Sequence, residues 1–170
     1  MKPELKYGLL GGAAVCLWIA LEYALGFHTT RPEIGVYTGL LSNFILIGTL
    51  FALLQIKRSA IYDGRLSLAV GIRTGLVASF VASLLVYCSL AGYTHFINPM
   101  WVDQALEVKV AAWRLQSLAE TEIQSRITLY RNAYTPAGLL WTTIVGMTLM
   151  GGLFSLGLTL VVRQLPHRAA

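Results

Sequence analysis

The clearest residue for chemistry in this sequence is an acidic side chain inside an apolar run. Glu22 is the one charged residue between Gly8 and Phe27, five residues before the end of that run. At a helical rise of 1.5 Å per residue, it lies about 7 Å below the boundary of a membrane. Low dielectric favours the neutral form of a carboxyl group, so Glu22 could serve as a proton or cation site. Alternatively, it hydrogen-bonds Asn43 or a hydroxyl group and only holds helices together, each such bond contributing about 1 kcal/mol.

Other polar residues fall at a similar depth in three further apolar runs. Asn43 lies about 11 Å from the same boundary by the same rise. Tyr87, next to Cys88, has a comparable place in the third run, and Thr142 and Thr143 have one in the fourth. If the four runs are antiparallel helices, these side chains can gather into one polar cluster. We therefore predict a candidate site at Glu22, Asn43, Tyr87, Thr142 and Thr143.

Two histidines are weak candidates for metal binding. His28 and His95 both stand at the ends of apolar runs, and Cys88 comes seven residues before His95. With Glu33 or Asp103 they could hold a divalent ion. Because no HExxH or CxxC spacing supports such a site, we predict no metal and no cofactor. Neither a Gly-rich phosphate loop nor a GxSxG elbow is present, so we do not expect an enzyme.

The elements that position these residues follow from the composition. The chain has 170 residues, of which 56% are hydrophobic and only 12% are charged, whereas soluble domains have roughly 25% charged residues. This excludes a disordered protein and indicates an integral membrane protein. Four runs meet the length of about 20 apolar residues that a span requires. We predict an all-α polytopic membrane protein with four transmembrane helices over about 8–27, 36–56, 74–96 and 137–162.

Proline and glycine add detail to these spans. All five prolines lie outside the predicted spans, which predicts continuous helices. Small residues at i and i+4 let helices approach closely in lipid. The expected packing positions are Gly8, Gly12, Gly35, Gly39, Gly71, Gly75, Gly151 and Gly152.

The basic residues predict the orientation. Four spans put both termini on one side, where eight basic residues would lie: Lys2, Lys6, Lys57, Arg58, Arg65, Arg73, Arg163 and Arg168. Basic residues concentrate on the cytoplasmic side, so we predict a cell (inner) membrane protein with cytoplasmic N- and C-termini. These residues stand beside span ends and form no continuous patch, so we expect the lipid bilayer and no nucleic acid as partner.

Residues 97–135 form the one long segment between spans. Apolar residues recur there at steps of three and four, which is typical of an amphipathic helix. Glu122 and Arg126 are spaced for an i, i+4 pair. We expect one or two helices on the outer membrane surface or over the end of the spans.

Several short motifs of this chain resemble one known family. They are Lys6-Tyr7-Gly8-Leu9-Leu10-Gly11, Asp63-Gly64-Arg65-Leu66-Ser67, the exit Phe96-Ile97-Asn98-Pro99, and the helical insert before a glycine-rich last span. They are similar to a bacterial domain-of-unknown-function family of small four-span membrane proteins. Met100 and Trp101 depart from the acidic residue that members tend to have after the Asn-Pro. The resemblance implies the topology and assigns no catalytic residue.

Two functions remain open from the sequence. The first is a structural or regulatory membrane protein that acts through helix or partner contacts, with homo-oligomers possible through a glycine-rich face. The second is a small proton- or cation-coupled transporter that works as an oligomer with Glu22 as the coupling site. Small multidrug exporters have a similar acidic residue in the first of four spans, but they are shorter and lack the insert.

Overall fold

The computed structural model describes residues 1–61 and 64–165, and all regular structure in these ranges is helical. Within them, four helical segments are long and apolar enough to cross a membrane: Pro3–Ala24, Pro32–Ala60, Leu68–Ile97 and Pro136–Gln164. The predicted fold class, an all-α protein with four such helices, is confirmed. Residue 63 of the motif Asp63-Gly64-Arg65 lies outside the described residues.

The four segments consist of several shorter elements, and two helices form the insert. The elements are α1 (Pro3–Ala24), α2 (Pro32–Thr38), α3 (Leu41–Ala60), α4 (Leu68–Gly92), the π-helix η1 (Tyr93–Ile97), α5 (Trp101–Leu115), α6 (Glu120–Ala133), α7 (Pro136–Leu139), the π-helix η2 (Leu140–Gly146) and α8 (Met147–Gln164).

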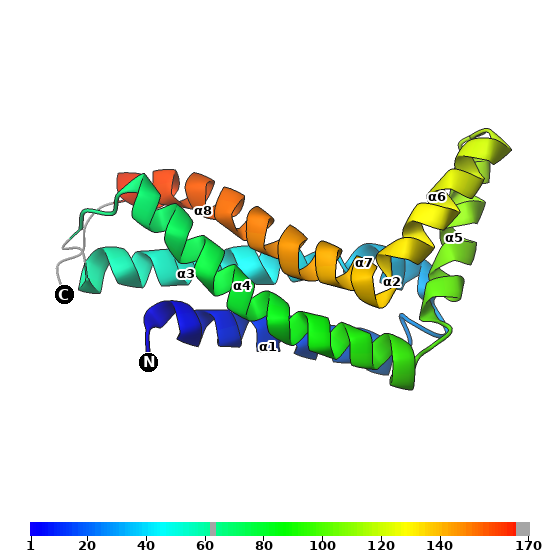
Figure 1. The fold of residues 1–170 in the computed structure, drawn as a ribbon, viewed down its shortest axis with the longest axis horizontal. Helices are drawn as coiled ribbons and strands as arrows, with labels where there is room; N and C mark the ends of the chain where they lie inside the picture. The colour runs from blue at the N-terminus through cyan, green and yellow to red at the C-terminus, as the bar shows by residue number, and fades with distance from the viewer. Residues whose placement is uncertain (62–63, 166–170) are drawn as a thin grey trace.

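The four long helices pack side by side as a ring in which each contacts at least two others. α1 contacts α3 and α4, and α8 also contacts both α3 and α4. Figure 1 shows the N-terminus and the loop between α3 and α4 at one end of the molecule, and α2, α5 and α6 at the other. We call these the terminal end and the insert end.

Three of the long segments begin earlier than predicted, at a proline. Pro3, Pro32 and Pro136 do not lie outside the long segments but begin them. The first helical turn needs no N–H donor, so proline is well suited to this position. In the second segment, Gly39 and Leu40 separate α2 from α3 but keep right-handed helical backbone angles, so Pro32–Ala60 remains one helix with a locally altered hydrogen-bond pattern. The third and fourth segments each contain a π-helical stretch, where the backbone bonds shift by one residue.

Six of the eight predicted packing glycines lie between long helices. An added Cβ on Gly8 would come within 2.6 Å of the Ala78 carbonyl oxygen, and one on Gly12 within 2.9 Å of that of Ala82. α1 and α4 therefore approach with almost no side chain between them. Gly71, Gly75, Gly151 and Gly152 lie in the same way between α4 and α8, against Thr159, Ser155, Ser79 and Leu76.

The remaining pair has a different place. Gly35 packs against the Phe27 carbonyl group, inside the connection between α1 and α2, and not against another long helix. Gly39 has no neighbour on another element within 4 Å of an added Cβ. The expectation that Gly35 and Gly39 form a helix-packing pair is wrong, because Gly35 faces the loop after α1 and Gly39 faces no other element.

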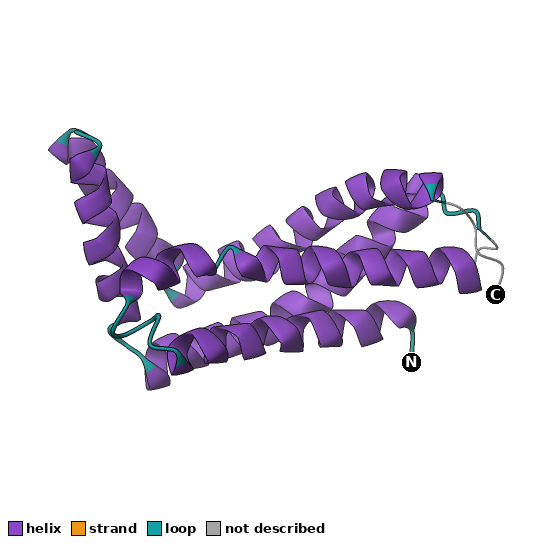
Figure 2. Ribbon diagram, turned by 180° about the vertical axis from the view of Figure 1, so that it is seen from behind, coloured by secondary structure: helices purple, strands orange, loops and turns teal. Residues whose placement is uncertain are grey.

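The predicted insert is a pair of helices. α5 and α6 lie side by side and project from the insert end, as Figures 1 and 2 show. Only the base of this hairpin packs on the long helices, through Trp101 and Ala105 against Tyr93. The expected Glu122–Arg126 pair is present at 2.7 Å on the exposed face.

Two apolar clusters and a buried arginine hold the terminal end together. Leu50, Leu53 and Ala78 form one cluster with Tyr7, and Leu54, Leu66 and Val162 form a second. The buried Arg58 guanidinium donates hydrogen bonds to the carbonyl groups of Gly64 and Leu165, and so ties the loop before α4 to the end of α8. This end also has a cavity of about 280 Å³, whose wall includes Glu4, Lys57 and Arg73.

Candidate functional site

Glu22 lies in the last turn of α1 and points into the protein. Its side chain is 2% exposed. The helix ends directly after it in a Schellman motif, in which Gly26 N–H bonds the Tyr23 carbonyl and Phe27 N–H bonds that of Glu22. Gly26 has a φ of 76°, a conformation that glycine adopts without strain. α1 thus ends at Ala24, short of the predicted Phe27, and the chain turns back toward the carboxylate.

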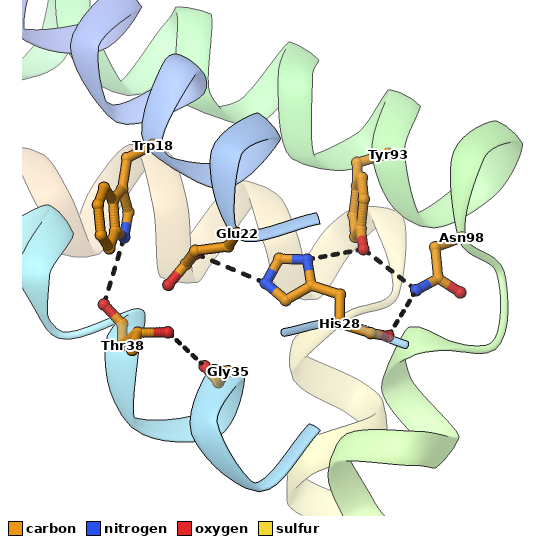
Figure 3. A network of polar contacts seen from close by, with 7 residues as sticks. All are labelled: Trp18, Glu22, His28, Gly35, Thr38, Tyr93 and Asn98. Carbon is orange, nitrogen blue, oxygen red and sulfur yellow. Dashed lines mark hydrogen bonds and ion pairs between the residues drawn. The ribbon is translucent and has the colours of Figure 1, made fainter. Parts of the chain in front are cut away.

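That turn brings His28 next to Glu22. His28 Nε2 lies 3.5 Å from Glu22 Oε2, and both side chains are almost fully buried. The imidazole ring packs between Tyr93 and Trp101, with ring centroids 5.3 Å and 4.1 Å away. The loop after α1 therefore supplies the partner of the buried acid, and the third segment and α5 hold this partner in place (Figure 3).

Tyr93 and Asn98 continue the network beyond His28. Tyr93 Oη lies 2.7 Å from His28 Nδ1. Asn98 Nδ2 donates to Tyr93 Oη and to the His28 carbonyl oxygen, at 3.1 Å each. Figure 3 shows these side chains in one row from Asn98 to Glu22.

The hydrogen-bond donors in this row all point the same way along it. Because Tyr93 Oη accepts from Asn98, its own hydrogen is available for His28 Nδ1. We therefore assign the hydrogen of a neutral His28 to Nε2, which faces Glu22. In this arrangement the N–H and O–H groups from Asn98 to His28 all point toward the carboxylate.

A cavity of about 400 Å³ opens beside the carboxylate. Every long segment and the insert contribute to its wall, which includes Glu22, His28, Val36, Ser42, Asn43, Leu46, Leu90, Tyr93, Trp101, Lys109, Tyr130, Tyr134, Thr142, Thr143 and Met147. Glu22 Oε1 has no hydrogen-bond partner among residues 1–61 and 64–165, although it is buried. We call this space the insert-end cavity.

Four of the five predicted cluster residues line this cavity. Glu22, Asn43, Thr142 and Thr143 do so, from three different long segments. Tyr87 does not: its helical neighbour Val86 faces the cavity, and one residue along a helix turns the side chain by about 100°. Including Tyr87 was therefore wrong. The carboxylate contacts His28, and within the described residues it has no hydrogen bond to Asn43.

The two histidines lie in different surroundings. His28 belongs to the buried network, whereas His95 is exposed and its Nδ1 lies 2.9 Å from the Ala91 carbonyl oxygen. In the described part of the chain, no three His, Cys, Asp or Glu side chains come close enough to hold a metal ion.

Sequence reasoning missed the partners of Glu22. Asn98 was noted only as part of the exit from the third span, and Trp101 only as a departure from the pattern of the family; Tyr93 was not singled out. A signal was present, because His28 and Asn98 follow the ends of the first and third spans, which run in the same direction and finish on the same side. Polar residues at neighbouring span ends can meet even when neither lies at membrane depth.

The insert adds aromatic rings and a positive charge to the wall. Lys109 Nζ of α5 lies 5.4 Å from the centre of the Tyr130 ring of α6. Burial, followed by the neighbouring Tyr134, raises the pKa of Tyr130 well above its usual value. Tyr130 thus stays a neutral hydrogen-bonding group at physiological pH. The cavity combines one buried acid, one lysine and several aromatic faces.

Comparison with known proteins supports one assignment. The sequence model of the family described as "Protein of unknown function (DUF4199)" matches residues 6–164. A search of the curated proteins and a search of the solved structures each gave no match. Since the matched region covers nearly all of the chain, the expected membership in an unknown-function family is confirmed: this protein belongs to the DUF4199 family.

Proposed function

We propose that this protein is a four-helix bundle of the inner membrane that binds a small molecule bearing an ammonium group in the insert-end cavity. The single observation that supports this is Glu22 Oε1, a buried carboxylate oxygen without a partner on the wall of an open cavity. The role is regulatory and non-catalytic, and it acts through contacts with partner proteins or a second copy of the chain.

The chemistry of the cavity favours a cationic N–H donor. A buried polar atom without a hydrogen bond destabilises the protein by about 1 to 3 kcal/mol, and a charged one by more. Glu22 Oε2 faces His28 already, so a ligand can bind through Oε1 and leave the network intact. Tyr93, Trp101, Tyr130 and Tyr134 present aromatic rings around the same space, and such rings attract cations.

The orientation we propose follows the charges. The terminal end faces the cytoplasm, where basic residues concentrate, and the insert-end cavity then faces the outside. A ligand would reach Glu22 from the outer side without passing the terminal end, which favours binding from the outside over transport.

Binding of simple amines tests this proposal. We expect n-butylammonium to raise the unfolding temperature of the purified protein in detergent, and n-butanol at equal concentration to leave it unchanged. Glu22→Gln should abolish the shift. Glu33→Gln is the matched control, because Glu33 is exposed at the first turn of α2 and does not line the cavity. Equal shifts by both compounds, or a full shift in Glu22→Gln, would contradict the proposal.

A proton- or cation-coupled transporter is the second candidate. The contacts from Tyr93 through His28 to Glu22 could pass a proton, which favours this alternative. The measurement is proton movement into vesicles that contain the purified protein, with and without n-butylammonium. Transport predicts ligand-dependent proton movement that Glu22→Gln abolishes, whereas binding alone predicts none.

A further inference from the structure

A second space continues the insert-end cavity along the side of the helices. It has a volume of about 240 Å³ and lies between α3 on one side and η2 with α8 on the other. Asn43, Leu46, Thr142 and Met147 line both spaces, so the two are adjacent. We call the second space the side groove.

The side groove is apolar and faces outward. Leu50, Met150 and Phe154 form much of its wall, and Met150 is 45% exposed. Gly146 leaves part of the wall without a side chain, since the atom nearest to an added Cβ there is 3.6 Å away. The groove runs from the insert end toward the terminal end. An acyl chain of a lipid whose head lies at the insert end would run in the same direction.

The charges of the insert-end cavity form a complementary pair. Glu22 from α1 and Lys109 from α5 line the same wall, so the cavity offers a negative and a positive group to one ligand. A ligand with a single positive charge would use only Glu22. A zwitterionic head with an ammonium and a phosphate would use both.

We propose that the occupant is a membrane phospholipid with a primary ammonium head, of the phosphatidylethanolamine type. Its ammonium donates to Glu22 Oε1, its phosphate pairs with Lys109, and one acyl chain lies in the side groove between α3 and α8. The lipid enters sideways from the bilayer past the exposed Met150 and Asn43. This inference rests on the proposed function, because it names the class of ligand that Glu22 binds.

Short-chain lipids test the head. Dihexanoyl phosphatidylethanolamine and dihexanoyl phosphatidylcholine share a phosphate and two acyl chains, but only the first has N–H donors. We expect purified protein in detergent to bind the first about tenfold more tightly in calorimetry, and Glu22→Gln to remove this difference. Lys109→Gln should weaken binding of both lipids, since both carry the phosphate. Soluble phosphoethanolamine should bind more weakly than either lipid; equal affinity would assign the site to a free headgroup.

Two substitutions test the tail. Gly146→Leu narrows the side groove and should weaken binding of both lipids while n-butylammonium still binds. Gly157→Leu is the matched control in α8: it makes the same change where an added Cβ meets nothing within 4 Å, away from the groove. Met150→Trp, on the exposed side of the groove, repeats the test in case the Gly146 variant does not fold.

The outcomes separate the two proposals. Retained n-butylammonium binding with equal affinity for the two lipids, or with no effect of Gly146→Leu and Met150→Trp, overturns the lipid assignment alone. If the native protein does not bind n-butylammonium either, the proposed function is overturned too.

Discussion

At the scale of single residues, the buried acid depends on groups from distant parts of the sequence. Asn98 positions Tyr93, Tyr93 fixes His28, and His28 faces Glu22. Tyr93 and His28 each have a partner in this row, and Glu22 Oε1 has no hydrogen-bond partner among the described residues. The network therefore orients the acid and leaves its binding atom open.

Removing the Tyr93 hydroxyl tests this dependence. Tyr93→Phe leaves His28 Nδ1 without its donor and removes one acceptor of Asn98, so we expect a loss of about 1 to 3 kcal/mol in the free energy of unfolding. Denaturation in detergent, followed by circular dichroism, measures it. Tyr37→Phe is the control, because Tyr37 is 62% exposed. An equal effect of both substitutions would contradict a structural role for the network.

The sequence allowed the acid to be predicted but not its partners. Glu22 stands out because a charge inside an apolar run is costly. His28 lies close to it only because Gly26 turns the chain back after α1, and that depends on a single backbone conformation. Tyr87 was misplaced for a related reason, since depth alone does not give the angle of a side chain around its helix.

At the scale of helices, contact between α4 and α8 depends on small side chains. Gly75 packs against Ser155, and Gly151 packs against Ser79, so each helix places a hydroxymethyl group on a glycine of the other. Ser79 and Ser155 are almost completely buried. These glycines face inward, so they are not available for the homodimer contact expected from their spacing.

An exchange of side chains across this contact tests its geometry. Gly151→Ala places a methyl group against Ser79, and we expect the overpacking to destabilise the protein by about 1 to 3 kcal/mol. Adding Ser79→Gly makes room again and should restore most of the stability. Gly157→Ala is the control, because nothing lies within 4 Å of its added Cβ. Thermal unfolding in detergent measures all three; a stable single variant would show that the helices separate easily.

The existence of the four long helical segments was predictable from the sequence, while the irregular stretches inside them were not. Apolar runs of span length give helices wherever backbone groups must bond within their own segment. Pro3, Pro32 and Pro136 were treated as boundaries but are first-turn residues, which extends the segments by a few residues. The altered hydrogen bonding at Gly39 and the π-helical stretches could not be predicted, because apolar periodicity indicates a helix and not its local hydrogen-bond pattern.

At the scale of the whole molecule, the two ends differ in chemistry. At the terminal end, the side chains of Lys57 and Arg58 are buried. Lys57 forms an ion pair with Glu4 and a hydrogen bond with Thr74. The insert end has the larger cavity and a projecting hairpin with surface ion pairs such as Arg131–Asp103. This asymmetry is the basis of the orientation that we propose.

Cysteine labelling in cells tests this orientation. After Cys16 and Cys88 are replaced by serine, Gln116→Cys places a thiol at the tip of the hairpin and Ser59→Cys places one at the terminal end; both positions are exposed. We expect a membrane-impermeant maleimide to label position 116 in intact cells and position 59 only after permeabilisation. The reverse pattern would place the insert-end cavity in the cytoplasm.

The contact between α4 and α8 also has a consequence for biogenesis. Because α8 is the last of the four long segments to be synthesised, the face of α4 with Gly71, Gly75 and Ser79 has no partner until translation has passed residue 164. α1 already covers another face of α4 through Gly8 and Gly12. A chain interrupted before Pro136 would therefore expose two glycines and the Ser79 hydroxyl of α4 on a face that α8 covers in the finished protein.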